Sequence, residues 1–445
     1  MSHDSGPVGR EPRSPAGEVR VLTSRWGDGR AHELDRFAEL GGYASLDDAF
    51  AKNPADLVQL VKDSGLRGRG GAGFPTGMKW GFLAKGTGRP TYLVVNADES
   101  EPGTFKDMEL LERDPHALVE GVIVSAYAIG CRTAFIYLRG ECGFAGRRLA
   151  AAIDAAYDKG LLGRDIRGSG FDLDVILHRG AGAYICGEET ALLSSLEGQR
   201  GQPKLRPPFP AVEGLYRAPT TVNNVETIAT VPWIVRKGVD WFRGMGTEKS
   251  PGPKLISVSG DVNNPGNFEF PMGTPAREVI MGAAGGMLDG KSLKAWTPGG
   301  SSTPLLTADH LDVTFDFEAI QAAGSLLGTA AVIVLSEDVC IVRACLNFTE
   351  FYAHESCGKC TPCREGTDWM RKILIRLETG QGRKDDPETL KDISDGIFGR
   401  VFCAFGDGAT SPILSALKYF PDEFAQHVDG HGCPFPGARV AAGAH

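Results

Sequence analysis

The sequence predicts an α/β domain, a small α+β module and a C-terminal helical bundle, in that order. Short apolar strands alternate with helical patterns up to about residue 240, as in α/β domains. From Pro253 glycine and proline become frequent, and from Asp338 onward helical periodicity dominates. We expect a disordered or extended tail, the α/β domain, the α+β module and the bundle at residues 1–33, 34–244, 245–333 and 334–445.

Hydrophobic spacing and capping residues place the individual elements. In the α/β domain we expect two short helices within 45–64, the second starting at Pro54. Further along, we expect strands at 91–96, 134–138 and 172–177, and helices at 115–129, 147–159 and 189–196. In the α+β module we expect a strand at 255–259 and a short helix at 274–282. In the bundle we expect helices at 339–354, 368–377, 387–397 and 411–420.

Composition and charge exclude several classes of partner. The net charge of −9, without a basic tract of binding size, argues against nucleic acid. The first 16 residues are polar and carry no secretory signal, and the longest apolar run, at 121–131, is too short to span a bilayer. We therefore expect any association with a membrane to come through partner proteins.

The cysteines carry the clearest chemical signal. Cys357, Cys360 and Cys363 stand three residues apart, and Cys403 follows forty residues later. A tight triplet plus one remote cysteine favours four-thiolate ligation of an iron–sulfur cluster. A zinc site or unrelated thiols are the alternatives, although zinc sites usually come as two separated pairs. Ten cysteines are too few for a disulfide scaffold in a chain of 445 residues, which indicates a reducing cytosol. We expect structural thiols at Cys131, Cys142, Cys186, Cys340, Cys345 and Cys433.

A glycine-rich loop follows the first helices. Gly68, Gly70 and Gly73 match G-x-G-x-x-G, but the preceding segment is helical and Pro75 follows, so an ordinary Rossmann turn is not expected. The six glycines of 65–77 still leave backbone N–H groups uncovered for a phosphate. Positive charge for that phosphate is available from Arg67, Arg69 and Lys79, and Phe74 can stack on a base. The alternative is a flexible loop without a ligand.

Polar groups also gather at three later points. Asn96, Asp98, Glu99 and Glu101 follow a predicted strand, where α/β ligands usually bind, although a solvated acidic turn has the same composition. The stretch 180–189 contains small residues and the aromatic ring of Tyr184. It ends in two carboxylates, Glu188 and Glu189, which either contact a ligand or cap a helix. Amide groups follow at Asn223 and Asn224, residues that are individually common in turns.

The combination of these segments resembles the NADH-binding flavoprotein subunit of respiratory complex I, the NADH:quinone oxidoreductase. The resemblance covers about residues 35 to 425 and is carried by 65–80, 96–107, 180–197, 207–210, 220–230, 355–366 and 402–404. It implies a Rossmann-like flavin domain, a ubiquitin-like module of the SLBB type, and a helical bundle that holds a 4Fe-4S cluster. The implied cofactors are FMN, the 4Fe-4S cluster and NAD(H).

The resemblance also assigns roles to residues. Those implied around FMN are Gly68, Arg69, Gly70, Lys79, Asn96, Asp98, Glu99, Tyr184, Gly187, Glu188, Val222, Asn223 and Asn224, and the rest of the glycine loop is assigned to cofactor binding at Gly71, Ala72, Gly73 and Gly77. Those implied along NADH are Phe74, Phe82, Glu101, Glu189, Arg206 and Phe209. Arg206 stands where the family pattern has lysine. Glu189 is expected to shape the catalytic pocket, without an acid or base role in hydride transfer, and the implied cluster ligands are Cys357, Cys360, Cys363 and Cys403.

The implied function is the input of electrons to complex I. NADH gives a hydride to FMN, and single electrons then pass to the cluster and on toward quinone. The implied partners are the small thioredoxin-like 2Fe-2S subunit and the large iron–sulfur subunit, on the cytoplasmic face of the inner (plasma) membrane. Two other hypotheses stay open: the diaphorase subunit of an NAD-linked formate dehydrogenase or hydrogenase, and a non-catalytic scaffold with a zinc site.

Overall fold

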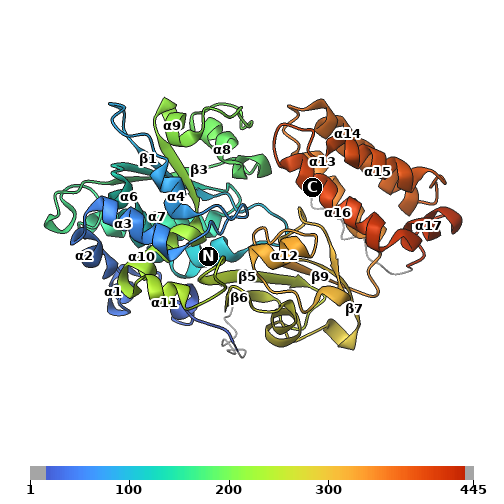
Figure 1. Cartoon of the computed structure of the whole chain (residues 1–445), viewed down its shortest axis with the longest axis horizontal. Coiled ribbons are helices and arrows are strands. Elements are labelled where there is room, and N and C mark those ends of the chain that lie inside the picture. Colours follow the sequence, from blue (N-terminus) through green and yellow to red (C-terminus); the bar gives the residue numbers. More distant parts are fainter. Residues whose placement is uncertain (1–16, 436–445) are drawn as a thin grey trace, which may run out of the picture.

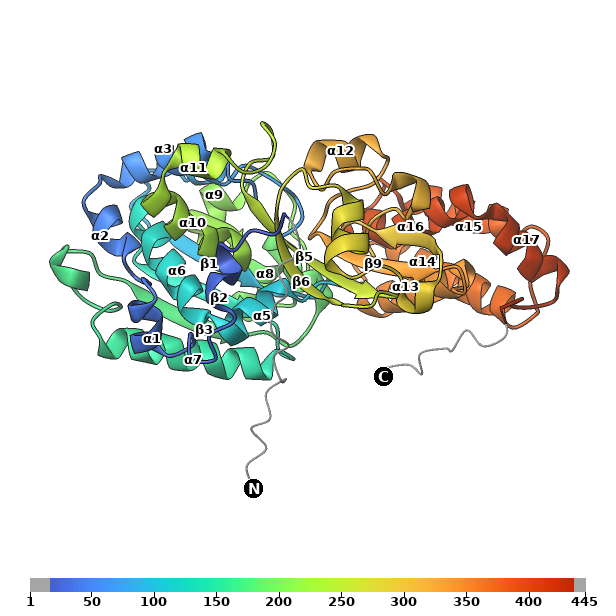
Figure 2. The same cartoon turned by 90° about the horizontal axis from the view of Figure 1, so that it is seen from below.

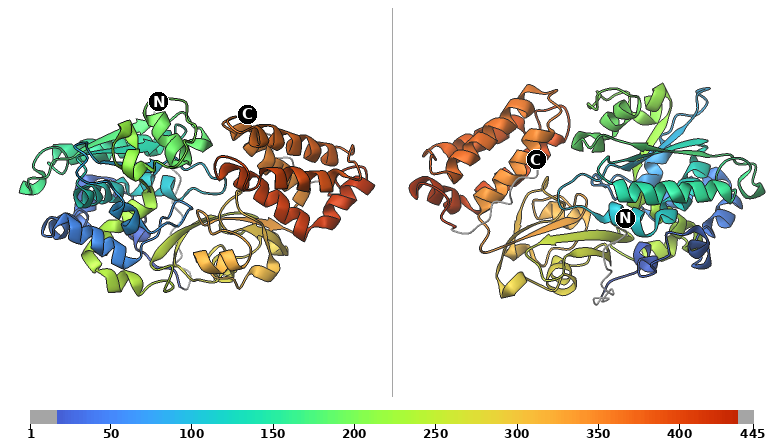
Figure 3. Two further views of the ribbon diagram at one scale, coloured as in Figure 1. Left: turned by 45° about the horizontal axis from the view of Figure 1, so that its top comes forward. Right: turned by 180° about the vertical axis from the view of Figure 1, so that it is seen from behind.

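The computed structural model describes residues 17–435. Figure 1 shows an α/β part in blue to green, a second part in yellow, and a helical part in orange to red, which meet near the middle of the molecule. Two further views show the same arrangement (Figure 3). The predicted fold class is therefore confirmed, whereas residues 1–16 of the expected tail lie outside the described residues.

The first part is built on a parallel sheet of four strands in the order β3-β2-β1-β4. The strands are β1 (Tyr92–Ala97), β2 (Thr133–Leu138), β3 (Asp174–Arg179) and β4 (Thr220–Asn224). The chain moves outward from β1 to β3 and then returns to add β4 on the other side of β1. The strand order thus reverses between β1 and β4, the place where α/β sheets bind ligands.

The two faces of this sheet are covered differently. Leu93 and Val95 of β1 belong to one core with the helices α6 (Pro115–Ile129), α7 (Gly143–Asp158) and α10 (Val225–Lys237), and Figure 2 shows α6 beside α10. Val94 faces the opposite side, because side chains alternate along a strand. That opposite face shares a core with α8 (Glu189–Leu196) and with residues of the C-terminal bundle.

The remaining helices of the first part are short. They are α1 (Leu34–Glu39), α2 (Ser45–Phe50), α3 (Pro54–Ser64), α4 (Thr76–Gly81), α5 (Lys106–Arg113), α8 (Glu189–Leu196), α9 (Pro210–Glu213) and α11 (Val239–Arg243). The two short helices predicted within 45–64 are confirmed, with Pro54 in the first turn of α3 where its missing N–H costs nothing. The strand β4 was not predicted, because its sequence Thr-Thr-Val-Asn-Asn is mostly polar.

The N-terminal stretch is packed wherever the structure describes it. Val21 and Leu22 are buried, and residues Leu22–Arg25 form a 3-10 turn. The buried carboxylate of Glu269 accepts hydrogen bonds from the backbone N–H groups of Val21, Leu22 and Thr23 at 2.8–3.0 Å. Of the two alternatives, a disordered or an extended tail, disorder is therefore wrong for residues 17–33, because a partner distant in sequence supplies the order.

The second part is a five-stranded mixed sheet in the order β6-β5-β9-β7-β8. Its elements are β5 (Pro253–Gly260), β6 (Gly266–Pro271), β7 (Leu293–Thr297), β8 (Leu306–Thr307), α12 (Phe317–Ala322) and β9 (Ala331–Ser336). The helix expected at 274–282 starts as α-helix at Ala276 and Arg277 and continues as a π-helical turn at Glu278–Ala283. Ala276 and Arg277 donate the N–H groups that the first turn leaves free to the carbonyls of Val313 and Leu311.

The third part contains five helices within the described residues. They are α13 (Ile341–Glu355), α14 (Thr361–Glu378), α15 (Asp386–Ile397), α16 (Phe405–Tyr419) and α17 (Pro421–Asp429). The four expected helices are confirmed, although α14 and α16 begin earlier than predicted, at Thr361 and Phe405. Helix α17 was missed because its buried face holds only Phe424 and His427, too sparse a pattern to detect.

We propose that the expected boundaries near residues 244 and 333 divide the chain into its structural units. One hydrophobic core ends at Leu255, and the next extends from Ile256 to Val334. Across the described part of the chain, no helix combines the length and apolarity that crossing a membrane requires.

The Glu269 contact predicts a large stabilising contribution. In Glu269→Ala, the buried N–H groups of residues 21–23 lose their acceptor, so we expect the free energy of unfolding to fall by about 3 kcal/mol. Thermal unfolding monitored by circular dichroism measures the change. Glu33→Ala is the control, because its exposed pair with Arg30 contributes little. Equal midpoints for the two variants would contradict the assigned role.

Candidate flavin cavity and iron–sulfur ligands

A cavity of about 820 Å³ lies where the three parts meet. Its wall includes the glycine loop and the ends of β1 and β4 from the first part. The second part contributes Ser302 and Gly328, and the bundle contributes Cys403 and Phe405. This volume is in the range of cofactor sites. The cavity therefore exists only when all three parts are in contact.

The sheet brings its most polar strand ends to this cavity. Asn96 and Asp98 come at the end of β1, and Asn224 comes at the end of β4, on the two sides of the reversal in strand order. The Asn96 amide donates to the Gly187 carbonyl at 2.8 Å, and the Asn224 amide donates to Asp107 at 2.6 Å. These amides are therefore fixed in orientation before any ligand arrives.

The charges behind Asn224 are buried and paired. Lys106 contacts Asp107 at 2.8 Å and Glu226 at 2.8 Å, and Lys254 of β5 contacts Glu226 at 2.7 Å. Burial opposes ionisation of Glu226, but Lys106 and Lys254 outweigh it and lower the pKa of that carboxyl to about 2. This cluster fixes the Asn224 end of the sheet against the second part.

The glycine loop presents backbone to the cavity at Gly70, Gly71 and Ala72. Hydrogen bonds from Gly68 N–H to the Phe74 carbonyl, at 2.9 Å, and from Thr76 N–H to the Leu66 carbonyl, at 2.8 Å, close the loop. A Cβ at Gly70 would come within 2.8 Å of the Asn224 Cβ, so only glycine fits there. The sequence argument that glycine leaves backbone accessible agrees with this geometry.

The positive charges of the loop are not placed as expected. Arg69 is fully buried, and its Nη2 donates to the Pro251 carbonyl at 2.8 Å, while burial lowers the pKa of the guanidinium to about 10. Arg69 is therefore not part of the cavity wall, and contact of its charge with a phosphate stays a prediction. Arg67 lines the cavity instead, where it contacts Glu318 at 2.5 Å. Sequence spacing cannot show which side of a loop an arginine takes.

Asp98 is a strongly perturbed carboxyl at the cavity. Its Oδ2 is buried without a hydrogen-bond partner, and its Oδ1 is 4.0 Å from Arg139. Burial raises the pKa of Asp98 to about 7, and the Arg139 charge only partly opposes this. An unpaired oxygen in the wall of a cavity indicates a place for a ligand hydrogen-bond donor.

Glu99 and Glu101 have defined partners. Glu99 accepts from the N–H groups of Asp107 and Met108, each at 2.8 Å, and so caps α5. Glu101 accepts from the Tyr184 hydroxyl at 2.7 Å and from the Ser302 N–H at 2.8 Å. Burial raises the pKa of both carboxyls. The solvated acidic turn is thereby excluded for this segment.

The turn at Tyr184–Gly187 joins the cavity to the bundle. Tyr184 N–H donates to Glu355 at 3.0 Å, and the Tyr184 ring packs edge-on against Phe351 and Phe405. Glu188 caps α8 by accepting from the N–H groups of Thr190 and Ala191 at 2.9 Å. The capping role of Glu188 that the sequence left open is therefore observed, and the residue also lines the cavity.

A second group of predicted residues lies outside the cavity wall. Lys79 contacts Glu189 at 2.7 Å, and Arg206 contacts Glu189 at 3.1 Å and also pairs with Glu188. Three aromatic side chains are about half exposed, Phe74, Phe82 and Phe209. Phe74 and Phe82 have ring centroids 6.2 Å apart, and Ala84 N–H bonds to the Ala211 carbonyl at 3.0 Å, which joins the loops that carry Phe82 and Phe209.

The four predicted cluster ligands gather in one place. Cys363 is packed with Cys357, Cys360 and Cys403 in the core between the sheet and the bundle. The Phe402 N–H points at the Cys360 sulfur at 3.4 Å, and the Ser356 hydroxyl lies 3.4 Å from the Cys363 sulfur. Gln202 binds the Cys357 carbonyl at 3.0 Å and thereby ties this loop to the first part.

Predicted site residues divide between the cavity wall and its surroundings. The wall contains Gly70, Gly71, Ala72, Asn96, Asp98, Glu99, Glu101, Tyr184, Gly187, Glu188, Asn224 and Cys403. The surroundings contain Gly68, Arg69, Gly73, Phe74, Gly77, Lys79, Phe82, Glu189, Arg206, Phe209, Val222 and Asn223. Lining residues that the sequence analysis did not single out include Ser302, Phe317, Gln321, Gly328 and Thr329. The glycine- and serine-rich run 299–303 was the available signal for this wall.

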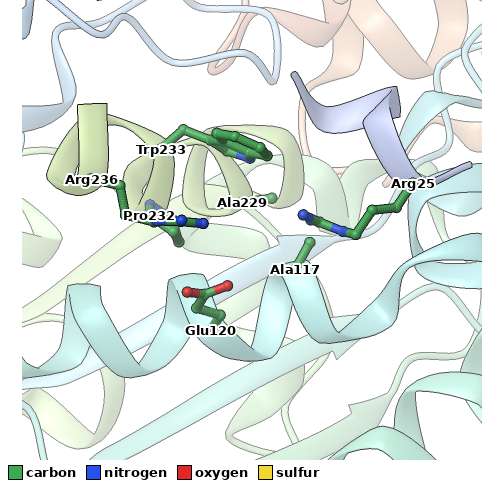
Figure 4. A pocket seen from close by; sticks show the side chains of 7 residues that line it. All are labelled: Arg25, Ala117, Glu120, Ala229, Pro232, Trp233 and Arg236. Carbon is green, nitrogen blue, oxygen red and sulfur yellow. The ribbon is translucent and has the colours of Figure 1, made fainter. Parts of the chain in front are cut away.

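A separate hollow of about 10 Å³ lies between α6 and α10. Figure 4 shows Glu120 of α6 facing Arg236 and Trp233 of α10, with Arg25 at the side. A space of this size accommodates one water molecule and no cofactor.

Comparisons with known proteins agree with this geometry. The sequence matches the Nuo51 FMN-binding domain over residues 61–233, the SLBB domain over 255–306, and the NADH-ubiquinone oxidoreductase-F iron-sulfur binding region over 343–427. It is 58% identical to the F subunit of NADH-quinone oxidoreductase in Streptomyces coelicolor over 422 residues, which cover 95% of this chain and 94% of the relative. The corresponding protein of Mycobacterium tuberculosis H37Rv is also 58% identical, over 93% of this chain and 95% of the relative.

The chain belongs to the family of NADH-quinone oxidoreductase F subunits. A solved structure also shares the fold of this F-family chain. A chain of an NAD+-reducing [NiFe]-hydrogenase in the H2-reduced state is similar with a TM-score of 0.81 and 36% identity, over 93% of this chain and 68% of that one.

As a member of the F family, the chain binds FMN and a 4Fe-4S cluster. The structure fits both groups. Glycine backbone at Gly70 and Gly187 and the unpaired Asp98 oxygen border a cavity large enough for a flavin nucleotide. Four thiols with N–H and hydroxyl donors beside two of the sulfurs fit an iron–sulfur cluster.

The raised pKa of Asp98 predicts a pH effect in the flavin-free chain. The folded state keeps the Asp98 proton up to about pH 7, whereas the unfolded state loses it near 4, so this group makes stability fall as pH rises between those values. Asp98→Asn does not titrate. Between pH 5 and pH 8, we expect the variant to gain about 3 kcal/mol relative to wild type, measured by urea unfolding. A pH-independent difference would contradict this assignment.

Proposed function

We propose that this F-family chain is the electron-input subunit of an NADH:quinone oxidoreductase. The observation that carries the proposal is that Cys403 lines the same cavity as Asn96 and Asp98. A hydride acceptor in that cavity therefore lies directly beside an iron–sulfur ligand. The proposed partners are the small thioredoxin-like 2Fe-2S subunit and the large iron–sulfur subunit, and the proposed location is the cytoplasmic face of the inner membrane.

When bound, FMN supplies the conversion from two-electron hydride chemistry to one-electron transfer. The chain's own residues hold and enclose it. We propose that the loop Gly70–Ala72 admits phosphate oxygens to backbone N–H groups, and that Asn96 and Asp98 offer partners for polar edges of the flavin ring. Tyr184 and Glu101 close the side of the cavity toward the bundle. None of these groups is required to act as an acid or base on a hydride.

We propose that NADH binds along Phe74, Phe82, Glu189, Arg206 and Phe209. Half-exposed aromatic rings on adjoining loops are unusual on a free surface and fit the stacking of an adenine base. Arg206 and Lys79 both contact Glu189 and offer positive charge for a pyrophosphate. Glu189 thereby fixes the two cations at the edge of the site.

A diaphorase subunit of an NAD-linked hydrogenase is the second candidate, favoured by the 36% identity to the hydrogenase chain. That chain is longer, since the matched region spans 68% of it. The relatives at 58% identity are named as quinone oxidoreductase subunits and match over nearly their whole length. Affinity purification from the native cell, with identification of co-purifying subunits, separates the two candidates.

An absorbance spectrum of the anaerobically purified chain tests the proposal. We expect a flavin band at about 450 nm that bleaches on addition of NADH. NADPH serves as the comparison nucleotide. A colourless protein, or a spectrum that NADH leaves unchanged, would refute the proposal and favour the non-catalytic scaffold.

Arg206→Ala tests the nucleotide site. Loss of its charge is expected to raise the KM for NADH about tenfold, equivalent to about 1.4 kcal/mol of binding, with flavin and iron contents unchanged. Steady-state assays with ferricyanide as acceptor measure the change. Arg217→Ala, at an exposed arginine whose side chain pairs with Glu213, is the matched control. An unchanged KM in Arg206→Ala would remove Arg206 from the nucleotide site.

A further inference from the structure

A second group of metal-binding side chains lies at the other end of the helical bundle. It comprises Cys340 before α13, Glu378 at the end of α14, His427 in α17, and Cys433 after α17. One ligand atom from each residue can be chosen so that all four lie within 4.8 Å of one another. Cys340 and His427 are buried, and Glu378 is 5% exposed, so this is not an acidic surface cluster.

The distances suit a single ion. The Cys340 sulfur is 3.3 Å from the His427 Nε2 and 3.3 Å from the Glu378 Oε1, and Nε2 is 3.1 Å from Oε1. Four ligands around one tetrahedral zinc, at about 2.0–2.3 Å from it, lie about 3.3–3.8 Å from one another. Small movements of these side chains would therefore complete the site.

The orientation of His427 is the second observation that points to a cation. Its Nδ1 lies 2.6 Å from the backbone carbonyl of Glu423, which can only accept, so Nδ1 carries the proton. In the neutral ring, Nε2 then presents a lone pair toward the Glu378 oxygen, which is also an acceptor. Only a proton or a metal ion between these atoms makes the contact favourable. A carbonyl that fixes the histidine tautomer in this way is typical of metal sites.

The surrounding charges also fit. Two thiolates, one carboxylate and one neutral imidazole exceed the charge of a divalent ion by one unit. Arg343 contacts the other Glu378 oxygen, with Nη2 at 2.5 Å and Nε at 2.8 Å. The arginine leaves Oε1 directed at Cys340 and His427 while it offsets the surplus charge.

We propose that Cys340, Glu378, His427 and Cys433 bind a structural zinc ion. Two sulfurs and an imidazole favour zinc over magnesium or calcium, and four protein ligands leave no open position for catalysis. This inference is independent of the proposed function. It also revises the expectation that Cys340 and Cys433 are plain structural thiols.

The site would hold together elements that are distant in sequence. It joins the start of α13 and the end of α14 to α17 and the segment that follows it. Glu423 of α17 also binds Lys294 of β7, at 3.0 Å, and the Ile341 N–H at 2.9 Å. The ion would therefore fasten α17 to the bundle, while Glu423 of the same helix binds the second part.

The zinc site is distinct from the cluster site. Helix α13 has 15 residues, about 22 Å at about 1.5 Å per residue, and it separates Cys340 at its start from the cluster loop after its end. A tetrahedral zinc site and an iron–sulfur site therefore occupy opposite ends of the same helix, and metal analysis can count them separately.

Metal analysis of the full-length chain tests the proposal. After anaerobic purification and a wash with EDTA, plasma mass spectrometry is expected to find about one zinc per chain beside the cluster iron. Zinc-edge X-ray absorption should show both sulfur and nitrogen or oxygen neighbours. Cys340→Ser and Cys433→Ser should each lower the zinc content about tenfold, while flavin content and bleaching by NADH stay unchanged.

Cys142→Ser and His354→Ala are matched controls, since Cys142 lies at the start of α7 and the His354 side chain is 85% exposed. Both should keep the zinc. Wild-type protein without zinc, or variants that retain it, would overturn the proposal. A Cys340–Cys433 disulfide in the anaerobic protein, found by mass spectrometry, would overturn it as well. The zinc content and zinc-edge spectrum of the wild-type protein test the proposal even if a variant fails to fold.

Discussion

The cavity depends on one buried carboxylate, that of Glu101, whose chain of hydrogen bonds reaches all three parts of the protein. One oxygen accepts from Tyr184 of the first part, and the other accepts from the Ser302 N–H of the second part. Tyr184 in turn donates its N–H to Glu355 at the end of α13. A carboxylate in an apolar interior is costly without such donors. Separation of the second part would remove the Ser302 donor, and separation of the bundle would remove the Glu355 acceptor that holds Tyr184, so cofactor site and domain arrangement stabilise each other.

The same contacts explain how one chain combines two kinds of redox centre. The sheet offers amides and a carboxyl at its strand reversal, where a flavin nucleotide fits. The cysteine loop of the bundle is held against that edge by contacts with Gln202 and Tyr184 of the first part. Gln202 binds the Cys357 carbonyl, and Tyr184 binds Glu355 and packs against the Phe405 ring. Short distances favour one-electron transfer, and here packing between the parts sets them. The protein's contribution to catalysis is thus mainly position and enclosure.

The two ends of the bundle differ in chemistry. Near the flavin cavity the thiols of Cys357, Cys360 and Cys363 come from one short loop. At the far end, Cys340 precedes α13, Glu378 ends α14 and His427 lies in α17. A loop can wrap a compact cluster by itself, whereas the far group forms only after α17 has packed. An ion at that end would hold α17 in place against local fraying. Because Lys294 of the second part pairs with Glu423 of α17, it would also support the contact between the bundle and the second part.

The sequence alone determined the fold class, the four cysteines that the fold brings together and most of the polar residues at the cavity. Apart from Cys403, which follows the cysteine triplet by forty residues, these signals are local, because the triplet, the strand ends and the glycine loop each lie within a short stretch of sequence. Only the tertiary structure decided that Arg69 is buried against Pro251, that residues 21–23 bind Glu269, and that the second part supplies a cavity wall. It also decided the meeting of Cys340 with His427. Each of these depends on which distant segment packs nearby, and side-chain direction and long-range partners leave no periodic trace in a single sequence.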